Sequence, residues 1–130
     1  MSKKVSLKGT WESGDNIINC RISLITFHED EAFIVFCPAL DLSGYGNTEE
    51  EAKRSFEVTL FEYFRYTANK KTIADDLKKH GWTLHKNMNK GATPPPMSDL
   101  LKTNEDFNRI FNTHEFKKTD TTIEIPCLVE

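Results

Sequence analysis

The stretch that decides the fold runs from Ala32 to Tyr66 and reads AFIVFCPALDLSGYGNTEEEAKRSFEVTLFEYFRY. It begins with a short apolar run, Phe33 to Cys37, and Pro38 ends that run because proline lacks the backbone N–H that a central strand donates. A glycine-rich segment follows, in which Leu42 to Gly46 predict a short third strand or an extended turn, and we expect positive φ angles at Gly44 and Gly46. The whole stretch predicts strand, turn, short strand, turn and helix in one block.

Thr48 predicts the start of the helix in the second half of this stretch. Its hydroxyl can cap the first helical turn, and Glu51 completes a capping box three residues later. The acidic run 49–51 places negative charge where the helix dipole favours it. An apolar stripe with helical spacing continues towards Asn69 and predicts the face that packs on a sheet: Ala52, Phe56, Leu60, Tyr63 and Phe64.

The flanking segments extend this block into a sheet. Residues 17–28, IINCRISLITFH, alternate apolar and polar side chains and predict a half-buried strand. The polar residues 28–31 predict a hairpin connection to the next strand. Downstream, residues 72–80 predict a short helix that Gly81 ends, and Trp82 to Lys86 predict a strand that returns to the sheet.

The C-terminal third has its own pattern. Gly91 and the prolines at 94–96 predict a linker, residues 98–112 one or two short helices, and residues 116–129 a strand-like tail. We therefore predict an α+β fold, an antiparallel sheet of three to four strands with one long helix packed on a face, plus a C-terminal α/β extension. The expected units are an N-terminal arm or edge strand (1–16), a main domain (17–87), and a proline-containing linker and extension packed on the same domain (88–130).

Composition excludes several classes of protein. The chain has 130 residues, a mass of 15.0 kDa and a formal net charge of −3, so it has no general attraction to nucleic acid. No apolar run is long enough to cross a membrane, and the N-terminal MSKKVSLKGTW lacks the apolar core of a secretory signal. Cys20, Cys37 and Cys127 form no CxxC pair, so we expect reduced thiols and a cytoplasmic location.

No group of residues predicts catalysis. An RNase H-like active site needs clustered carboxylates to hold two metal ions, whereas Asp41 and Glu124 are isolated in the sequence. The acidic turn after His28 offers adjacent side chains, which converge poorly on one ion, and His80 and His85 lack a third ligand. We therefore expect no catalytic, cofactor-binding or metal-ligating residue, no cofactor, and a protein that is not an enzyme.

Two apolar residues of the helix lie off its inward stripe. Val58 and Phe61 are flanked by Arg54 and Arg65, and an outward Phe requires something to cover it. The sequence favours cover by residues 100–116 of the C-terminal extension. The alternative is that Arg54, Val58, Phe61 and Arg65 form a subunit or partner interface.

The central block resembles the HicB-like antitoxin family. The resemblance lies in Pro38-Ala39-Leu40, Gly46-Asn47-Thr48 and Glu50-Glu51-Ala52, then in the aromatic end of the helix and the expected strand at 82–86, so it spans residues 17–87. It implies a truncated RNase H-like fold without catalytic carboxylates. It also implies a partner, HicA, a small basic toxin that cleaves mRNA and whose active site such antitoxins block.

The resemblance leaves several functions open. The expected function is a non-catalytic antitoxin that occludes a HicA-like toxin, and the alternatives are a stand-alone interaction or regulatory module with the same fold, or an RNase H-like nucleic-acid enzyme. Many family members add a DNA-binding segment, but residues 88–130 are not basic and show no helix-turn-helix pattern, which argues against direct DNA binding. Free edges on a small sheet predict a homodimer, and no membrane partner is expected.

Overall fold

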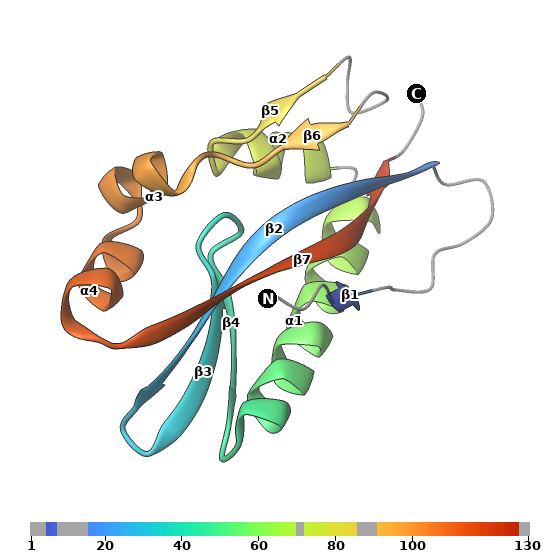
Figure 1. The fold of residues 1–130 in the computed structure, drawn as a ribbon. Helices are drawn as coiled ribbons and strands as arrows, with labels where there is room; N and C mark the ends of the chain where they lie inside the picture. Colours follow the sequence, from blue (N-terminus) through green and yellow to red (C-terminus); the bar gives the residue numbers. More distant parts are fainter. Residues whose placement is uncertain (1–4, 8–15, 70–71, 86–90, 128–130) are drawn as a thin grey trace.

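The structure is a sheet with helices on both faces. The computed structural model describes residues 5–7, 16–69, 72–85 and 91–127, arranged as Figure 1 shows. The strands are β1 (Val5–Leu7), β2 (Asn16–Glu29), β3 (Ala32–Cys37), β4 (Leu42–Gly46), β5 (Thr83–Leu84), β6 (Ala92–Thr93) and β7 (Phe116–Cys127). The helices are α1 (Glu49–Asn69), α2 (Ile73–Lys79), α3 (Met97–Thr103) and α4 (Glu105–Thr113).

Five of the described strands form one sheet in the order β1-β7-β2-β3-β4. The strands from β7 to β4 are antiparallel, and β1 adds a short parallel edge beside β7. β2 and β7 pair from Asn16 opposite Cys127 to Phe27 opposite Phe116, so the predicted C-terminal tail is a full partner of the first long strand. The predicted α+β fold, a long helix on an antiparallel sheet, is confirmed.

A two-residue turn joins β2 to β3. Glu29 pairs with Ala32, which leaves Asp30 and Glu31 as the loop, with φ angles of 51° and 65°. Positive φ at both loop positions is typical of a type I′ turn, whose twist matches that of the flanking strands. The predicted hairpin is therefore confirmed, and its tip is acidic.

The glycines of β4 differ from the prediction. Gly44 and Gly46 lie within the strand, opposite β3, and neither has a positive φ angle. A Cβ atom at Gly44 would lie 2.2 Å from the Phe56 nitrogen, and one at Gly46 would lie 2.5 Å from the Ala52 nitrogen. The prediction of turn glycines is wrong, because these positions lack a side chain for another reason: the backbone of α1 packs directly on the backbone of β4.

α1 begins at the predicted cap. The Glu51 N–H donates to Thr48 Oγ1 at 3.1 Å. Glu51 Oε1 accepts from the Asn47 N–H at 3.4 Å, whereas in a capping box the glutamate accepts from the cap residue itself. The predicted apolar stripe faces the sheet, and its fully buried members are Ala52, Phe56, Leu60 and Phe64.

α2 ends as Gly81 predicts. Gly81 has a φ angle of 89°, and its N–H donates to the Lys78 carbonyl at 3.0 Å. The Trp82 N–H donates to the Leu77 carbonyl at 3.0 Å, which completes a Schellman motif. The buried Trp82 indole then donates from Nε1 to the Ala39 carbonyl at 2.7 Å, and this bond attaches the end of α2 to the turn between β3 and β4.

The strand predicted at 82–86 does not return to the main sheet. Thr83 and Leu84 instead pair with Thr93 and Ala92 in a separate two-stranded sheet, and Lys86 lies outside the described residues. The prediction is wrong because β7 pairs with β2 from Asn16 to Phe27, which leaves no room for residues 82–86 on that edge of β2. The proline run that follows β6 leads straight into α3, whose N-terminal flanking residue is Pro96.

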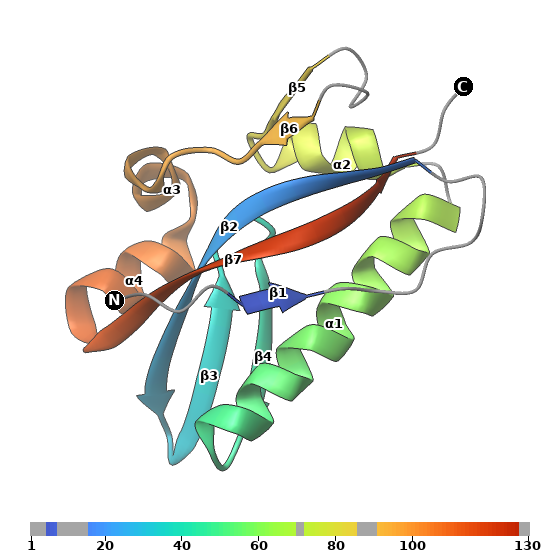
Figure 2. The same cartoon turned by 45° about the vertical axis from the view of Figure 1, so that its right-hand side comes forward.

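The C-terminal extension packs on the face of the sheet opposite α1 (Figures 1 and 2). On β2, the Leu24 side chain faces α1 and lines a groove with Lys53. Phe27 points to the opposite face of the sheet, where its ring lies 5.3 Å from the ring of His114, the residue just after α4. The buried residues of α3 and α4 belong to the same core cluster as Phe56, namely Leu100, Phe107 and Ile110. The prolines therefore do not mark the boundary of a separate core.

Replacing Gly44 with alanine tests the backbone contact between β4 and α1. The added methyl group would lie 2.2 Å from the Phe56 nitrogen, so the strand or the helix must shift. We expect the free energy of unfolding, measured by urea denaturation, to fall by about 3 kcal/mol. Ser43→Ala in the same strand is the control and should change it by less than about 0.5 kcal/mol. Equal effects of the two changes would contradict the contact.

Candidate interaction surfaces

The outer face of α1 carries the surface that the sequence predicts. Val58 is 64% exposed, Arg54 and Arg65 are exposed, and Phe61 is half-buried. The expectation that residues 100–116 cover this face is wrong, because α3 and α4 pack on the other side of the sheet (Figure 2). The reason is the face on which α4 packs: the His114 ring just after α4 lies 5.3 Å from the Phe27 ring, and Phe27 is on the face of β2 opposite Leu24, which faces α1.

A second surface is formed by acidic residues at one end of the sheet. The β2–β3 turn contributes Glu29, Asp30 and Glu31, and the start of α1 contributes the run 49–51. The pairing of Phe33 with Gly46 brings these two segments to the same end of the sheet, at the bottom of Figure 1. We call these six residues the acidic end.

Ion pairs neutralise only part of the acidic end. Glu49 Oε2 lies 2.8 Å from Lys117 Nζ. Glu29 Oε1 lies 2.8 Å from Arg109 Nη1 and 2.9 Å from His114 Nε2. Within the described residues, no ion pair involves the remaining acidic side chains, which are all exposed: Asp30, Glu31, Glu50 and Glu51. The acidic end therefore presents a net negative charge.

The Glu29 cluster attaches the C-terminal extension to the β2–β3 hairpin. The hydrogen bond from Arg109 is the main cause that holds the pKa of Glu29 below its ordinary value of 4.5, and the charges of Arg109 and His114 act in the same direction. The carboxylate is therefore ionised at neutral pH and accepts from α4 and from the residue that follows it. This contact positions one side of the acidic end.

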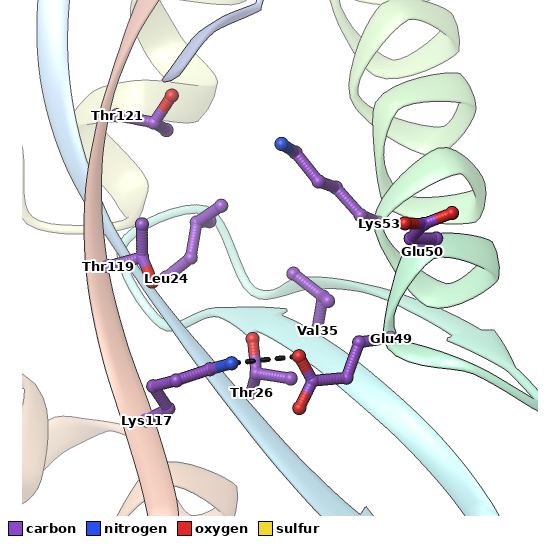
Figure 3. A pocket seen from close by; sticks show the side chains of 9 residues that line it. All are labelled: Leu24, Thr26, Val35, Glu49, Glu50, Lys53, Lys117, Thr119 and Thr121. Atoms are coloured by element: carbon purple, nitrogen blue, oxygen red, sulfur yellow. Dashed lines mark hydrogen bonds and ion pairs between the residues drawn. The ribbon is translucent and has the colours of Figure 1, made fainter. Parts of the chain in front are cut away.

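A groove of about 190 Å³ lies beside the acidic end, between α1 and β7 (Figure 3). The ion pair between Glu49 and Lys117 crosses it, and the Lys53 side chain extends from α1 into it. The floor comes from β2 and β3 and the walls from α1 and β7, with these lining residues: Leu24, Thr26, Val35, Glu49, Glu50, Lys53, Lys117, Thr119 and Thr121. An apolar floor with charged walls suits a polar polypeptide segment better than a purely apolar ligand.

The sequence did not show that the two acidic runs lie close together. Residues 28–31 were correctly predicted in a hairpin and residues 49–51 at the start of a helix, but nothing in the sequence placed these two segments beside each other. The signal was present in the strand lengths, because a β3–β4 hairpin returns the chain at Gly46 to the level of Phe33. The register of the β3–β4 hairpin can be predicted only when both of its ends are known. Because Gly44 and Gly46 were expected to have positive φ angles in a turn, the end of β4 was not recognised.

His80, His85 and Asp41 have structural hydrogen-bond partners. His80 Nδ1 lies 2.8 Å from the Asp76 carbonyl, and His85 Nε2 lies 3.0 Å from Thr93 Oγ1. Asp41 Oδ1 accepts from Asn104 Nδ2 at 3.2 Å. In the part of the chain that the structure describes, no three His, Cys, Asp or Glu side chains are arranged to hold a metal ion.

The two described thiols are buried, as their strand positions predict. Burial raises the pKa of Cys20 to about 11 and that of Cys37 to about 12. The Cys20 thiol also donates to the Ala92 carbonyl at 3.3 Å. The side chain of Cys127 lies outside the described residues. Both described thiols are therefore neutral and inaccessible near neutral pH.

No protein-family model, curated protein or solved structure matches this chain. Of the described helices, none combines the length and the apolar character needed to cross a membrane. A proposal for function therefore depends on the surfaces described above and on the sequence motifs.

The titration of Glu29 tests the contact that holds α4 on the hairpin. Because its folded-state pKa is depressed, the carboxylate stabilises the fold above its ordinary value of 4.5, and that contribution is lost as the pH falls through the lower folded-state pKa. We expect an NMR titration midpoint below 4.5 that moves towards 4.5 in Arg109→Met. Arg54→Met removes a distant charge and should leave the midpoint in place. A midpoint unmoved by Arg109→Met would contradict this account.

Thiol accessibility tests the burial of β2 and β3. In a Cys127→Ser background, we expect neither Cys20 nor Cys37 to react with a disulfide reagent at about pH 8 in the folded protein. Both should react at once in denaturant, because unfolding removes the burial that raises their pKa values. Spectrophotometric release of the reagent's thiolate measures this. Rapid reaction of a folded thiol would show that the core is more open than the structure describes.

Proposed function

We propose that this protein is a non-catalytic binding protein whose acidic end docks a small basic partner. The observation that carries the proposal is the group of exposed acids at one end of the sheet, Asp30, Glu31, Glu50 and Glu51, for which the described residues supply no ion-pair partner. Charges on two adjacent turns act together, because both tips lie at the same end of the sheet. A positively charged protein surface is the complementary partner.

The resemblance to HicB-like antitoxins supplies the class of partner. Two of the three motifs that carry the resemblance lie in and around this end: Gly46-Asn47-Thr48 lead into α1, and Glu50-Glu51-Ala52 form its first turn. Pro38-Ala39-Leu40 form the turn at the opposite end of β3. We propose a HicA-like mRNA-cleaving toxin as the partner, since such a toxin is small and basic.

The mechanism is occlusion of an RNA-binding surface. A ribonuclease that holds the phosphate backbone with Lys and Arg side chains presents a positive surface. The acidic end attracts that surface and fixes its orientation, and it denies RNA access while bound. The groove between α1 and β7 adjoins the docking surface and can accept a partner segment. No bond is made or broken by this chain in such a role.

The cellular setting follows from the same proposal. A partner that cleaves mRNA acts in the cytoplasm, and the buried, unpaired thiols of Cys20 and Cys37 suit a reducing compartment. Regulation of its own operon by DNA binding is not part of the proposal, because the helices described after β6, α3 and α4, have no excess of basic residues.

Charge reversal at the acidic end tests the proposal. The chain is co-expressed with the small basic protein encoded beside it, and growth rescue and co-purification are measured. We expect Glu31→Lys combined with Glu50→Lys to weaken binding at least about tenfold through lost attraction and new repulsion. The matched control is Asp75→Lys with Asp99→Lys, which makes the same change in net charge at exposed first-turn acids of α2 and α3, away from the acidic end.

The outcomes separate the competing functions. Rescue lost only in the acidic-end variant supports docking at this surface. Equal loss in both variants indicates a general charge effect and overturns the assigned site. Absence of any toxic or co-purifying neighbour favours a stand-alone module, and metal-dependent RNA cleavage by the chain alone would establish an enzyme instead.

A further inference from the structure

The sheet edges offer less room for self-association than the sequence predicts. At the β4 edge, the Tyr45 N–H donates to Ser55 Oγ of α1 at 3.1 Å, so a donor of the edge strand is already used. At the other edge, β1 pairs with β7 opposite Thr121 to Ile123. Edge-to-edge pairing of two copies is therefore disfavoured along parts of both edges, and another surface is needed for a homodimer.

The outer face of α1 carries a charge pattern that is complementary to itself when reversed. Centred on Val58, the pattern is negative at Glu51, positive at Arg54, negative at Glu62 and positive at Arg65. These positions lie seven and four residues before and after Val58, so they cluster on one side of a helix with about 3.6 residues per turn. All five side chains are exposed, and they lie opposite the stripe that Phe56 and Leu60 bury.

We propose that two copies of this chain associate through α1, with the helices antiparallel and Val58 on the two-fold axis. In this register Arg54 faces Glu62 of the second copy, and Glu51 faces Arg65 of the second copy. The two-fold axis repeats each pair, so every charge in the pattern meets its opposite. A parallel arrangement would place each charge against its own copy, which is repulsive at all four positions.

The two kinds of contact have different roles. Exposed ion pairs contribute little to the free energy of association, so they select the antiparallel register more than they hold the dimer together. Burial of Val58, which is 64% exposed in one chain, contributes to the free energy of association, with half-buried Phe61 at the margin. Arg65 Nε already lies 3.7 Å from Glu62 Oε2 within one helix, and the second copy extends this pair into a network.

The dimer is independent of the proposed docking function. Of the acidic end, only Glu51 takes part in the α1 pattern, and Asp30, Glu31 and Glu50 are outside it. Two copies joined at Val58 would therefore each keep most of an acidic end for a basic partner. A monomeric protein would refute the dimer without affecting the docking proposal.

Cysteine cross-linking tests both the contact and its register. Val58→Cys and Arg65→Cys are compared, because both residues are exposed and lie on the same side of α1. Each is made in a Cys127→Ser background, where Cys20 and Cys37 are buried. Helix axes about 8–10 Å apart, with a Cα radius of about 2.3 Å, leave facing Cα atoms within the reach of a disulfide.

The antiparallel register predicts different results for the two variants. Mild oxidation should convert Val58→Cys to a covalent dimer, whereas Arg65→Cys should stay uncross-linked because its two sites would be about 21 Å apart along the helices. Cross-linking of both variants would indicate a parallel pair, and cross-linking of neither would indicate no α1 contact. Either result overturns the proposal.

Charge exchange gives a second, non-covalent test. We expect Arg54→Glu to weaken self-association about tenfold in analytical ultracentrifugation, because each copy then presents a negative side chain to Glu62 of the other. Adding Glu62→Arg to the same chain should restore the dissociation constant to within about twofold of the original. Failure of the double variant to recover, with circular dichroism showing an intact fold, would exclude the proposed pairing.

Discussion

The close contact between the backbones of α1 and β4 positions the long helix on the sheet. Gly44 and Gly46 lack side chains, so the helix backbone lies directly on the strand, and a Cβ atom at either position would overlap it. This approach lets Phe56 and Phe64 of the same helix reach full burial above the sheet. It also determines where α1 begins, and so it holds the acidic first turn beside the β2–β3 turn.

The C-terminal strand completes the structure that this contact begins. β2 is a long strand, and β3 pairs only with its last part, from Ile25 to Glu29. β7 covers the opposite edge of β2 along its full pairing, which brings α3 and α4 onto the face away from α1. The hydrogen bond between Arg109 and Glu29 then attaches the extension to the hairpin tip. One continuous core results, and it leaves the outward side of α1 uncovered by the extension.

The two surfaces differ in their chemistry and therefore in the partners that they suit. The acidic end is of one sign, so it attracts a partner of opposite charge and repels a second copy of itself. The outer face of α1 carries both signs in an order that is complementary on reversal, so it suits a second copy. Both surfaces use the same helix, the first at its N-terminal turn and the second along its middle. This arrangement allows a dimer and a heterologous partner to be bound together.

The elements could be predicted from the amino-acid sequence: the strands at 17–28 and 33–37, the helix that Thr48 caps, and the end of α2 at Gly81. These depend on side-chain period and on local backbone chemistry, which neighbouring residues settle. The sequence also identified Arg54, Val58, Phe61 and Arg65 as a candidate surface, because an outward apolar residue on a helix is visible from its period.

How these elements meet could not be predicted in this way and is seen in the folded molecule. The fold places Gly44 and Gly46 inside a strand under α1, pairs β7 rather than residues 82–86 with β2, and brings two acidic turns to one end of the sheet. Each of these facts joins segments far apart in the chain, and a period-two or helical pattern contains no information about which distant segment it will face. The glycines show the reason most clearly: a missing side chain permits both a positive φ angle and a close approach, and only the position of the second element distinguishes them.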